Sequence, residues 1–584
     1  MADRAGAASG ERFARPLILI RGFGGPDVRD EQADPYQGFN NGTVYRHRRG
    51  ENFIYEGFLL RALKSGRYRD ATNVVGYYPR ESGPTGPTGP VTAAGSAGAG
   101  AEDAAAAGGD PASAWPDELT SGSVAVHPEA AREVVEQHGV AGTVWVYRYY
   151  DLLPRTLHRY GEGLARLIRI IRHGAGLSPP AGRSPFTGVD IVAHSMGGLV
   201  VRSALRQLKE AGKDPAELVH RIVTLGTPHR GIAFQLLPDR LLRALPGFRD
   251  AADEFAAFDP GSTEFLQVGR WFPVERILTV VGTDYRSYGP GAASLANRLS
   301  SLVDQDTLET NRSDGLVKQS AAQLPGAPRT FVHKCHGGRD SLVTSREAYE
   351  IAMRFFHGTH RVGLWLDAAE VTRGEDFFGR SEFWFGVSVK PRYVDFALFD
   401  QRPEAENCYG PFDLDRNGEF RSRLPELREA LSMPLSAPGD PTTGWLRTGP
   451  PNRRWIWEGW LDRTAKPEGR DQDGTLVLRI DLQVGERDTL GIGFHDNLVF
   501  RKQYYLQVLP GDPPAALYLH TGERYLARND PEALDAVPAD RPDRPVRAEQ
   551  EASGAWTFPV GGTGFTGTLG FAVTPEDTEA PGHP

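Results

Sequence analysis

The chain has 584 residues, of which 40% are hydrophobic and 24% charged, a composition typical of a globular protein with two or more domains. Its formal net charge of −9 argues against a nucleic-acid-binding protein, which needs a concentrated basic face. Two cysteines are too few for a disulfide framework or a multi-thiolate zinc site, and no apolar run approaches the roughly 20 residues that span a bilayer.

The first apolar stretch, residues 16–20, is too short for the core of a signal peptide, and no small-residue cleavage site follows it. Residues 1–15 are mostly small and polar, so they are expected to form a flexible tail. Because this start does not resemble a signal peptide, the protein is expected to stay in the cytoplasm. Export by a route that needs no N-terminal signal stays open.

From residue 16 to about 360, short apolar runs alternate with helical stripes. The runs expected as buried strands are 17–20, 73–77, 144–147, 189–193, 221–225, 277–281 and 330–332. Helical spacing is shown by Leu157, Leu164, Leu167 and Ile171, by Val201, Ala204, Leu205 and Leu208, and by residues 345–356. Strands that alternate with helices predict an α/β catalytic domain over 16–360, with a mostly parallel sheet covered on both faces.

Residues 81–123 are predicted to be a flexible insert in this domain. The stretch 81–110 is dominated by Gly, Ala and Pro, and Val91 is its only branched aliphatic residue. Such a segment buries too little surface to offset the entropy that ordering would cost.

The pattern changes after about residue 358. In residues 475–484 apolar side chains recur at every second position, which predicts a half-buried strand, and aromatic-rich segments recur at 383–389, 504–508 and 517–519. Residues 361–573 are therefore predicted to form a β-sandwich, followed by a flexible tail over 574–584.

The stretch with the clearest chemistry is AHSMG at 193–197, which lies between a predicted strand and a predicted helix. A sharp strand-to-helix turn of this kind exposes a nucleophilic serine, and it needs small residues two positions to either side, here Ala193 and Gly197. The helix N-terminus is also aimed at any oxyanion that forms there. Ser195 is therefore the candidate nucleophile.

A nucleophilic serine needs a base and an acid that orients the base. In chain order the acid should come next, and both Asp284 and Asp314 qualify. The base is His333 or His336, and His336 is preferred because it lies in the loop after the strand.

Together these features resemble bacterial lipase-type α/β-hydrolases. The resemblance covers residues 16–357, and four motifs carry it: RGFGG at 21–25, AHSMGG at 193–198, LGTPHRG at 225–231 and SDGLV at 313–317. It implies an ester hydrolase with Ser195 as nucleophile, Asp314 as acid and His336 as base. It further implies oxyanion donors at the backbone N–H groups of Phe23 and Met196, and no metal or organic cofactor.

One position departs from the family pattern. Arg21 stands where the family usually has a His that helps to hold the oxyanion loop, so the brace of this loop is left open. His194 and His229, which lie within these motifs, are expected either to pack in the core or to support the catalytic side chains without touching the substrate.

The substrate is predicted to be an acyl ester or a lipid. Residues 229–274 carry apolar side chains at helical spacing, which fits either a lid over an acyl pocket or an ordinary packed helix. An acyltransferase or thioesterase would use the same three side chains, and a binding or scaffold protein acting through the β-region is the alternative from another class.

Two weaker signals lie in the β-region, which could bind a lipid surface, a carbohydrate or a protein partner. Residues 413–418 open like a calcium loop, but Leu424 stands where a bidentate glutamate is needed, so an Asn-Gly hairpin is preferred. The cluster Trp455, Ile456, Trp457 and Trp460 could be a binding platform, and core packing is the preferred interpretation.

Overall fold

The computed structural model describes residues 14–22, 57–78, 115–149, 152–177, 186–230, 268–285, 313–319, 321–324, 326–337, 340–371, 381–392, 394–402, 405, 407–413, 454–463, 475–488, 497–511 and 514–576. Within these ranges, no helix combines the length and the apolar character needed to cross a membrane. The described residues form two compact units. One contains the residues up to Val192 and Val200–His220, and the other contains Ala193–Leu199 and the residues from Arg221 onward.

Seven strands form a sheet in the order β2-β5-β1-β6-β7-β8-β9. Their bounds are β1 Leu17–Ile20, β2 Arg69–Asp70, β5 Thr143–Val146, β6 Val189–His194, β7 Val219–Leu225, β8 Ile277–Gly282 and β9 Arg329–Val332. The pairs β1–β5, β2–β5, β7–β8 and β8–β9 are parallel. Apart from the edge strand β2, these strands are almost entirely buried, as expected for a sheet covered on both faces. The predicted α/β class is confirmed, and the architecture is that of an α/β-hydrolase.

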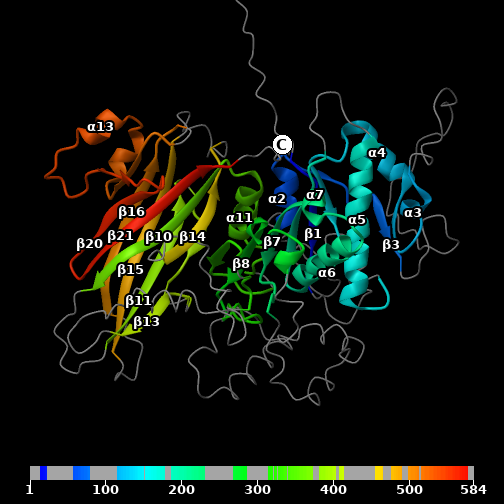
Figure 1. The fold of residues 1–584 in the computed structure, drawn as a ribbon, viewed down its shortest axis with the longest axis horizontal. Coiled ribbons are helices and arrows are strands. Elements are labelled where there is room, and N and C mark those ends of the chain that lie inside the picture. Colours follow the sequence, from blue (N-terminus) through cyan, green and yellow to red (C-terminus); the bar gives the residue numbers. More distant parts are fainter. Residues whose placement is uncertain are drawn as a thin grey trace, which may run out of the picture. The chain divides into compact units, whose positions relative to one another are not determined.

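Helices fill the connections between these strands. They are α2 Phe58–Lys64, α3 Asp117–Thr120, α4 Pro128–His138, α5 Leu157–Leu177, α6 Met196–Glu210, α7 Pro215–Leu218 and α11 Arg346–His357, with short 3₁₀ turns η6 Val268–Arg270 and η7 Val274–Arg276. The predicted apolar stripe of α5 faces inward, because Leu164, Leu167 and Ile171 are buried. In the first unit α4 lies beside α5 (Figure 1).

One predicted strand lies outside this sheet. Residues 73–77 were expected among the strands of the parallel domain, but β3 (Val75–Tyr77) pairs antiparallel with β4 (Val124–Val126) as a separate two-stranded sheet. Apolar content predicts that a strand forms, whereas its partner depends on contacts distant in the sequence.

The predicted flexible insert extends too far. Trp115 is only 6% exposed and packs on His173, with ring centroids 5.0 Å apart, and α3 follows directly. One tryptophan therefore anchors a segment that average composition assigned to a flexible loop. Residues 81–114 of the predicted insert lie outside the described residues.

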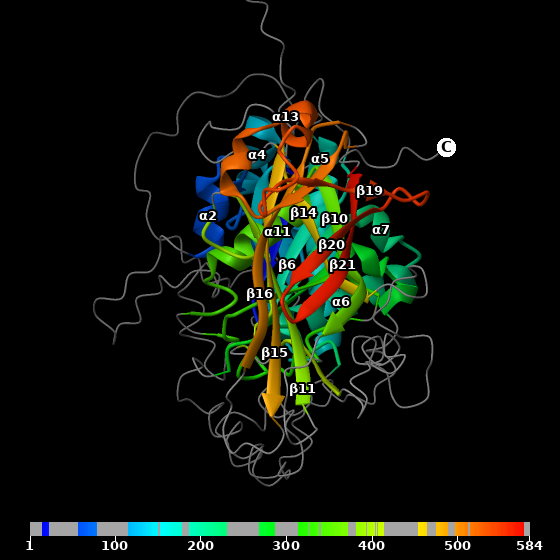
Figure 2. The same ribbon diagram turned by 90° about the vertical axis from the view of Figure 1, so that its left-hand side faces the viewer.

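The second unit also contains two antiparallel sheets, with strand orders β14-β10-β21-β20-β19 and β12-β11-β15-β16-β17-β18, and with β13 paired to β11. The bounds are β10 His360–Val371, β11 Ser381–Pro391, β12 Phe399–Asp400, β13 Tyr409–Asp413, β14 Arg454–Leu461, β15 Leu476–Asp488, β16 Asn497–Val508, β17 Leu517–His520, β18 Val546–Arg547, β19 Glu549–Gln550, β20 Trp556–Gly562 and β21 Phe565–Pro575. Figure 2 shows β11, β15 and β16 side by side. The predicted β-rich region after the parallel sheet is therefore confirmed, although it also contains a short helix and a 3₁₀ turn.

Aromatic side chains join the two antiparallel sheets. Phe565 of β21 lies 6.1 Å from Phe385 of β11 and 5.0 Å from Phe500 of β16, measured between ring centroids. On β14, Trp457 and Trp460 are 2% and 4% exposed, so they are core residues, as preferred from the sequence, rather than a binding platform. The side chain of Trp455 lies outside the described residues.

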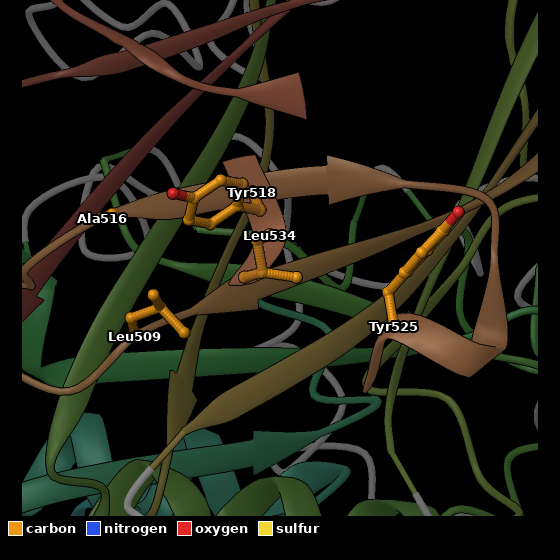
Figure 3. Packing of buried hydrophobic residues seen from close by; sticks show 5 residues of the cluster. All are labelled: Leu509, Ala516, Tyr518, Tyr525 and Leu534. Atoms are coloured by element: carbon orange, nitrogen blue, oxygen red, sulfur yellow. The ribbon is translucent and has the colours of Figure 1, made fainter. Parts of the chain in front are cut away.

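A smaller cluster closes one end of this sandwich. Tyr518 of β17 packs with Leu509, Ala516, Tyr525 and Leu534, and it brings the 3₁₀ turn η9 (Glu523–Ala527) and the helix α13 (Pro531–Asp535) onto the sheet (Figure 3). The buried hydroxyl of Tyr518 donates to Asp535 Oδ1 at 3.0 Å, which satisfies its polar atom.

The C-terminal tail was predicted to begin at residue 574, but β21 continues to Pro575 and Glu576 is anchored. The guanidinium of Arg221, on β7, donates to the carbonyl of Phe355 at the end of α11 and to the Glu576 carboxylate, and it lies 5.0 Å from the centroid of the Phe355 ring. The short, Pro-rich and acidic composition of residues 574–584 does not reveal a partner more than 300 positions away.

The substitution Glu576→Gln tests this anchor. Because Arg221 is only 9% exposed, removal of its anionic partner should lower the free energy of unfolding by roughly 1–3 kcal/mol. The measurement is the midpoint of urea unfolding at unchanged m. The control Glu549→Gln, on an exposed residue, should leave the midpoint in place, and equal midpoints for both variants would contradict the prediction.

Candidate active site

The turn between β6 and α6 holds Ser195 in the left-handed region, with φ of +51°, and Ser195 is the only non-glycine residue with positive φ in the described part of the chain. Its amide donates to the carbonyl of Leu225 on β7 at 2.9 Å, and its carbonyl accepts from the amide of Gly198 at 3.1 Å. A non-glycine residue in this conformation costs of order 1–3 kcal/mol, so the surrounding hydrogen bonds have to hold it there. The predicted strand-turn-helix context of Ser195 is present.

Three side chains form a hydrogen-bonded series at this turn. His336 Nε2 lies 2.9 Å from Ser195 Oγ, and His336 Nδ1 lies 2.8 Å from Asp314 Oδ2. The three residues are 6%, 4% and 1% exposed in the order Ser195, His336, Asp314. Because an ionised carboxylate only accepts, Nδ1 carries the proton and Nε2 is left to accept from the serine hydroxyl.

The two carboxylate oxygens of Asp314 have different hydrogen-bond partners. Oδ1 accepts from the backbone amides of Leu316 at 3.0 Å and Val317 at 2.7 Å, which leaves Oδ2 to face His336. The amide of His336 also donates to the Asp314 carbonyl at 2.8 Å. Main-chain and side-chain bonds together therefore fix the acid against the imidazole.

The alternative base His333 and the alternative acid Asp284 lie close to this site but are not part of the hydrogen-bonded series. His333 Nδ1 lies 3.2 Å from Thr283 Oγ1, at the ends of β9 and β8, while the amide of Asp284 donates to the carbonyl of Lys334. The acid joined to His336 Nδ1 is Asp314, and the histidine beside Ser195 is His336.

A glycine provides the space for the Asp314–His336 pair. Gly226, in the LGTPHRG segment, has φ of +56°, and a Cβ there would lie 2.8 Å from Asp314 Oδ2 and 3.2 Å from His336 Nδ1. Any side chain at position 226 would therefore push into the hydrogen bond between acid and imidazole.

Two further contacts support the site, and the sequence does not identify the partners that they join. His194 Nε2 lies 2.9 Å from the carbonyl of His336, so the residue before the serine also fixes the loop of the histidine. In the other unit, Tyr149 Oη donates to the carbonyls of Arg21 at 3.1 Å and Gly22 at 2.8 Å, and so braces the start of the RGFGG segment. No local pattern marks either contact, because each depends on residues more than 100 positions away.

Cys335 precedes His336 but lacks the setting of a nucleophile. Its side chain is buried, and its Sγ lies 3.0 Å from the carbonyl of Asp340. Burial first, and then the negative charges of Asp284, Asp340 and Asp314, raise the pKa of the thiol to about 12. The thiol therefore stays protonated at neutral pH.

Several predicted features lie outside the described residues. They are Phe23, residues 231–267 of the predicted lid, and Leu414 to Gly418 of the calcium-like segment. Among the described residues, no three His, Cys, Asp or Glu side chains gather as metal ligands would.

Comparison with known proteins matches residues 152–241, which include Ser195, to the family described as PGAP1-like alpha/beta domain. No curated protein matches the chain. A metagenomic carboxyl esterase of known structure is 18% identical, with 39% of this chain and 68% of the esterase covered and a TM-score of 0.26. Phospholipase PlaB from Legionella pneumophila, in complex with thio-NAD, is 11% identical, with 61% and 83% covered and a TM-score of 0.24.

The substitution Gly226→Ala should displace Asp314 from His336. We expect the rate at which Ser195 reacts with a fluorophosphonate probe to fall by roughly 10²-fold, the effect of about 1 Å of misplacement. The control Gly212→Ala introduces a similar backbone strain, since Gly212 has φ of +71°, but no atom lies within 4 Å of the added Cβ. A labelling rate that Gly226→Ala leaves unchanged would contradict the expectation that the Asp314–His336 hydrogen bond supports the reactivity of Ser195.

The buried thiol gives a second test. In the folded protein at pH 8, Cys335 should remain unmodified by iodoacetamide, because both its burial and its raised pKa disfavour the thiolate. Unfolding in urea should make it fully reactive. Mass spectrometry of the peptide that contains Cys335 measures both states, and rapid alkylation of the folded protein would oppose the prediction.

Proposed function

We propose that this chain is a serine hydrolase that cleaves carboxylic ester bonds, with Ser195 as nucleophile, His336 as general base and Asp314 as the acid that orients it. The observation that carries the proposal is the continuous series from Ser195 Oγ through His336 to Asp314 Oδ2, built on a left-handed serine. The α/β-hydrolase topology supports it as well, because the acid and the histidine follow the serine in the chain order expected of that fold.

In the proposed mechanism, Ser195 Oγ attacks the ester carbonyl while His336 Nε2 takes the hydroxyl proton. Asp314 keeps the proton of the neutral imidazole on Nδ1 and stabilises the imidazolium that forms. The imidazolium then gives its proton to the leaving alcohol, which departs as the acyl-enzyme forms. Water, activated by the same histidine, attacks the acyl carbonyl; the bond to Ser195 Oγ breaks, the carboxylic acid leaves, and His336 returns the proton to Ser195 Oγ.

The developing oxyanion needs hydrogen-bond donors. The amide of Met196 is the proposed donor, since Met196 is the first residue of α6 and the first amides of a helix have no acceptor within the helix. The amide of Phe23 is the second proposed donor, and it rests on the family resemblance alone.

We further propose acyl esters or lipids as the substrate class, with residues 16–360 as the catalytic domain and residues 361–573 as a β-domain. A scaffold protein with a degenerate site is disfavoured by the intact hydrogen-bonded series. An acyltransferase would share the acyl-enzyme and differ only in the acceptor, so the acceptor has to be identified by experiment.

The first experiment measures hydrolysis of p-nitrophenyl esters with acyl chains of two to sixteen carbons. We expect the wild type to be active and Ser195→Ala to fall to background, because the variant can form no acyl-enzyme. The chain-length profile then separates an esterase from a lipase. A wild type inert on all esters, including detergent-dispersed ones, would overturn the proposal.

Asp314→Asn separates the two candidate acids. It should lower kcat by roughly 10⁴-fold, the loss found when a triad acid becomes an amide that favours the wrong tautomer of the histidine. The matched control is Asp284→Asn, which changes a neighbouring buried carboxylate and should cost far less. The opposite ranking of the two variants would assign the acid to Asp284.

A further inference from the structure

The loop that carries Asp314 ends against the β-sandwich. Gln319 Nε2 donates to the carbonyl of Ala405, in the connection between β12 and β13, at 3.3 Å. Gln319 and Ala405 are 7% and 1% exposed. The backbone carbonyl of Gln319 also accepts from Gln323 Nε2 at 2.8 Å, so both its main chain and its side chain are fixed.

The hairpin from 313 to 318 connects this bond to the acid. Ser313 and Lys318 form an antiparallel bridge, and the amide of Asp314 donates to the carbonyl of Val317 at 3.2 Å. Gln319 follows Lys318 directly. Since the hairpin is short and closed on itself, fixing position 319 also fixes the position of the Asp314 carboxylate.

The connection that receives the bond is itself fixed to the sandwich. Gln401 Nε2 donates to the carbonyl of Asn407 at 3.0 Å, and Asn407 Nδ2 donates to the carbonyl of Asp400 on β12 at 2.6 Å. From β15, Gln483 Nε2 donates to the carbonyl of Gln401 at 3.3 Å. The carbonyl of Ala405 therefore lies between residues that side-chain amides hold in place, and one of these amides, from the partly buried Gln483, comes from the central strand β15.

We propose that Gln319 is a positioning residue through which the β-sandwich holds Asp314 against His336. The inference rests on the proposed function, because it assigns Gln319 a role in the orientation of the acid. The β-sandwich then contributes to catalysis through its contact with the acid loop, besides any ligand that it binds.

The test compares wild type with Gln319→Met, which keeps the length of the side chain and removes its donor. We expect kcat on p-nitrophenyl esters to fall roughly three- to tenfold, the rate equivalent of one neutral hydrogen bond, with KM unchanged. Hydrogen exchange at the amides of Leu316 and Val317, which bond Asp314 Oδ1, should become faster, as measured by mass spectrometry of the peptide over 313–319. If this variant does not fold, Gln319→Asn, with an amide too short to reach, should show the same direction.

The matched control is Thr330→Val. Thr330 Oγ1, on β9, donates to the carbonyl of Leu398, and this buried bond is a second contact with the β-sandwich that does not involve the loop of Asp314. This variant should lower Tm and leave kcat and the exchange of the 313–319 peptide unchanged. If Gln319→Met behaves like Thr330→Val in both, the inference is overturned. A wild type that neither hydrolyses esters nor reacts with a fluorophosphonate overturns the proposed function instead. In that case, hydrogen exchange of the 313–319 peptide in Gln319→Met and Thr330→Val still tests whether Gln319 holds the loop of Asp314.

Discussion

The left-handed backbone at Ser195 is the constraint on which the proposed site depends. A serine stays at φ of +51° only where its neighbours prevent relaxation to a normal turn. Here the carbonyl of Leu225 accepts its amide, and Gly198 lets α6 approach Thr227 so closely that an added Cβ would lie 2.3 Å from Thr227 Oγ1. The glycines and small residues of the motifs are therefore needed for packing around a strained turn.

The second requirement is that segments distant in the sequence meet at this turn. Parallel strands present their carboxyl ends at one edge of a sheet, and Asp314 and His336 follow β8 and β9 in the chain. Gly226 then leaves room for their hydrogen bond, and the two amides on Asp314 Oδ1 select the oxygen that faces the imidazole. The acid's orientation thus results from backbone geometry more than from charge.

Local sequence signals predicted what depends on neighbouring residues. Each of these features has a signal that lies within its own short stretch of sequence. They are the strands β1 and β5 to β9, the apolar stripe of α5, the serine turn and the alternation along β15. The pairing of β3 with β4 and the bond from His194 to His336 could not be predicted in this way, since each depends on long-range contacts. The preference for Asp314 over Asp284 came from the family resemblance, because spacing alone left both open.

The β-sandwich is not joined to the parallel sheet in the way that a domain on a long flexible linker would be. Only Gly358 and Thr359 separate α11 from β10, and Trp460 packs edge-on against Phe355 with ring centroids 4.5 Å apart. A domain on a flexible linker would leave such surfaces in water, at a cost set by the apolar area exposed. Arg221 and the loop of Gln319 also bond to residues of this region. The sandwich and the half of the parallel sheet that carries the proposed triad therefore belong to one compact unit. A substitution in the sandwich is expected to alter the stability of that half of the sheet as well.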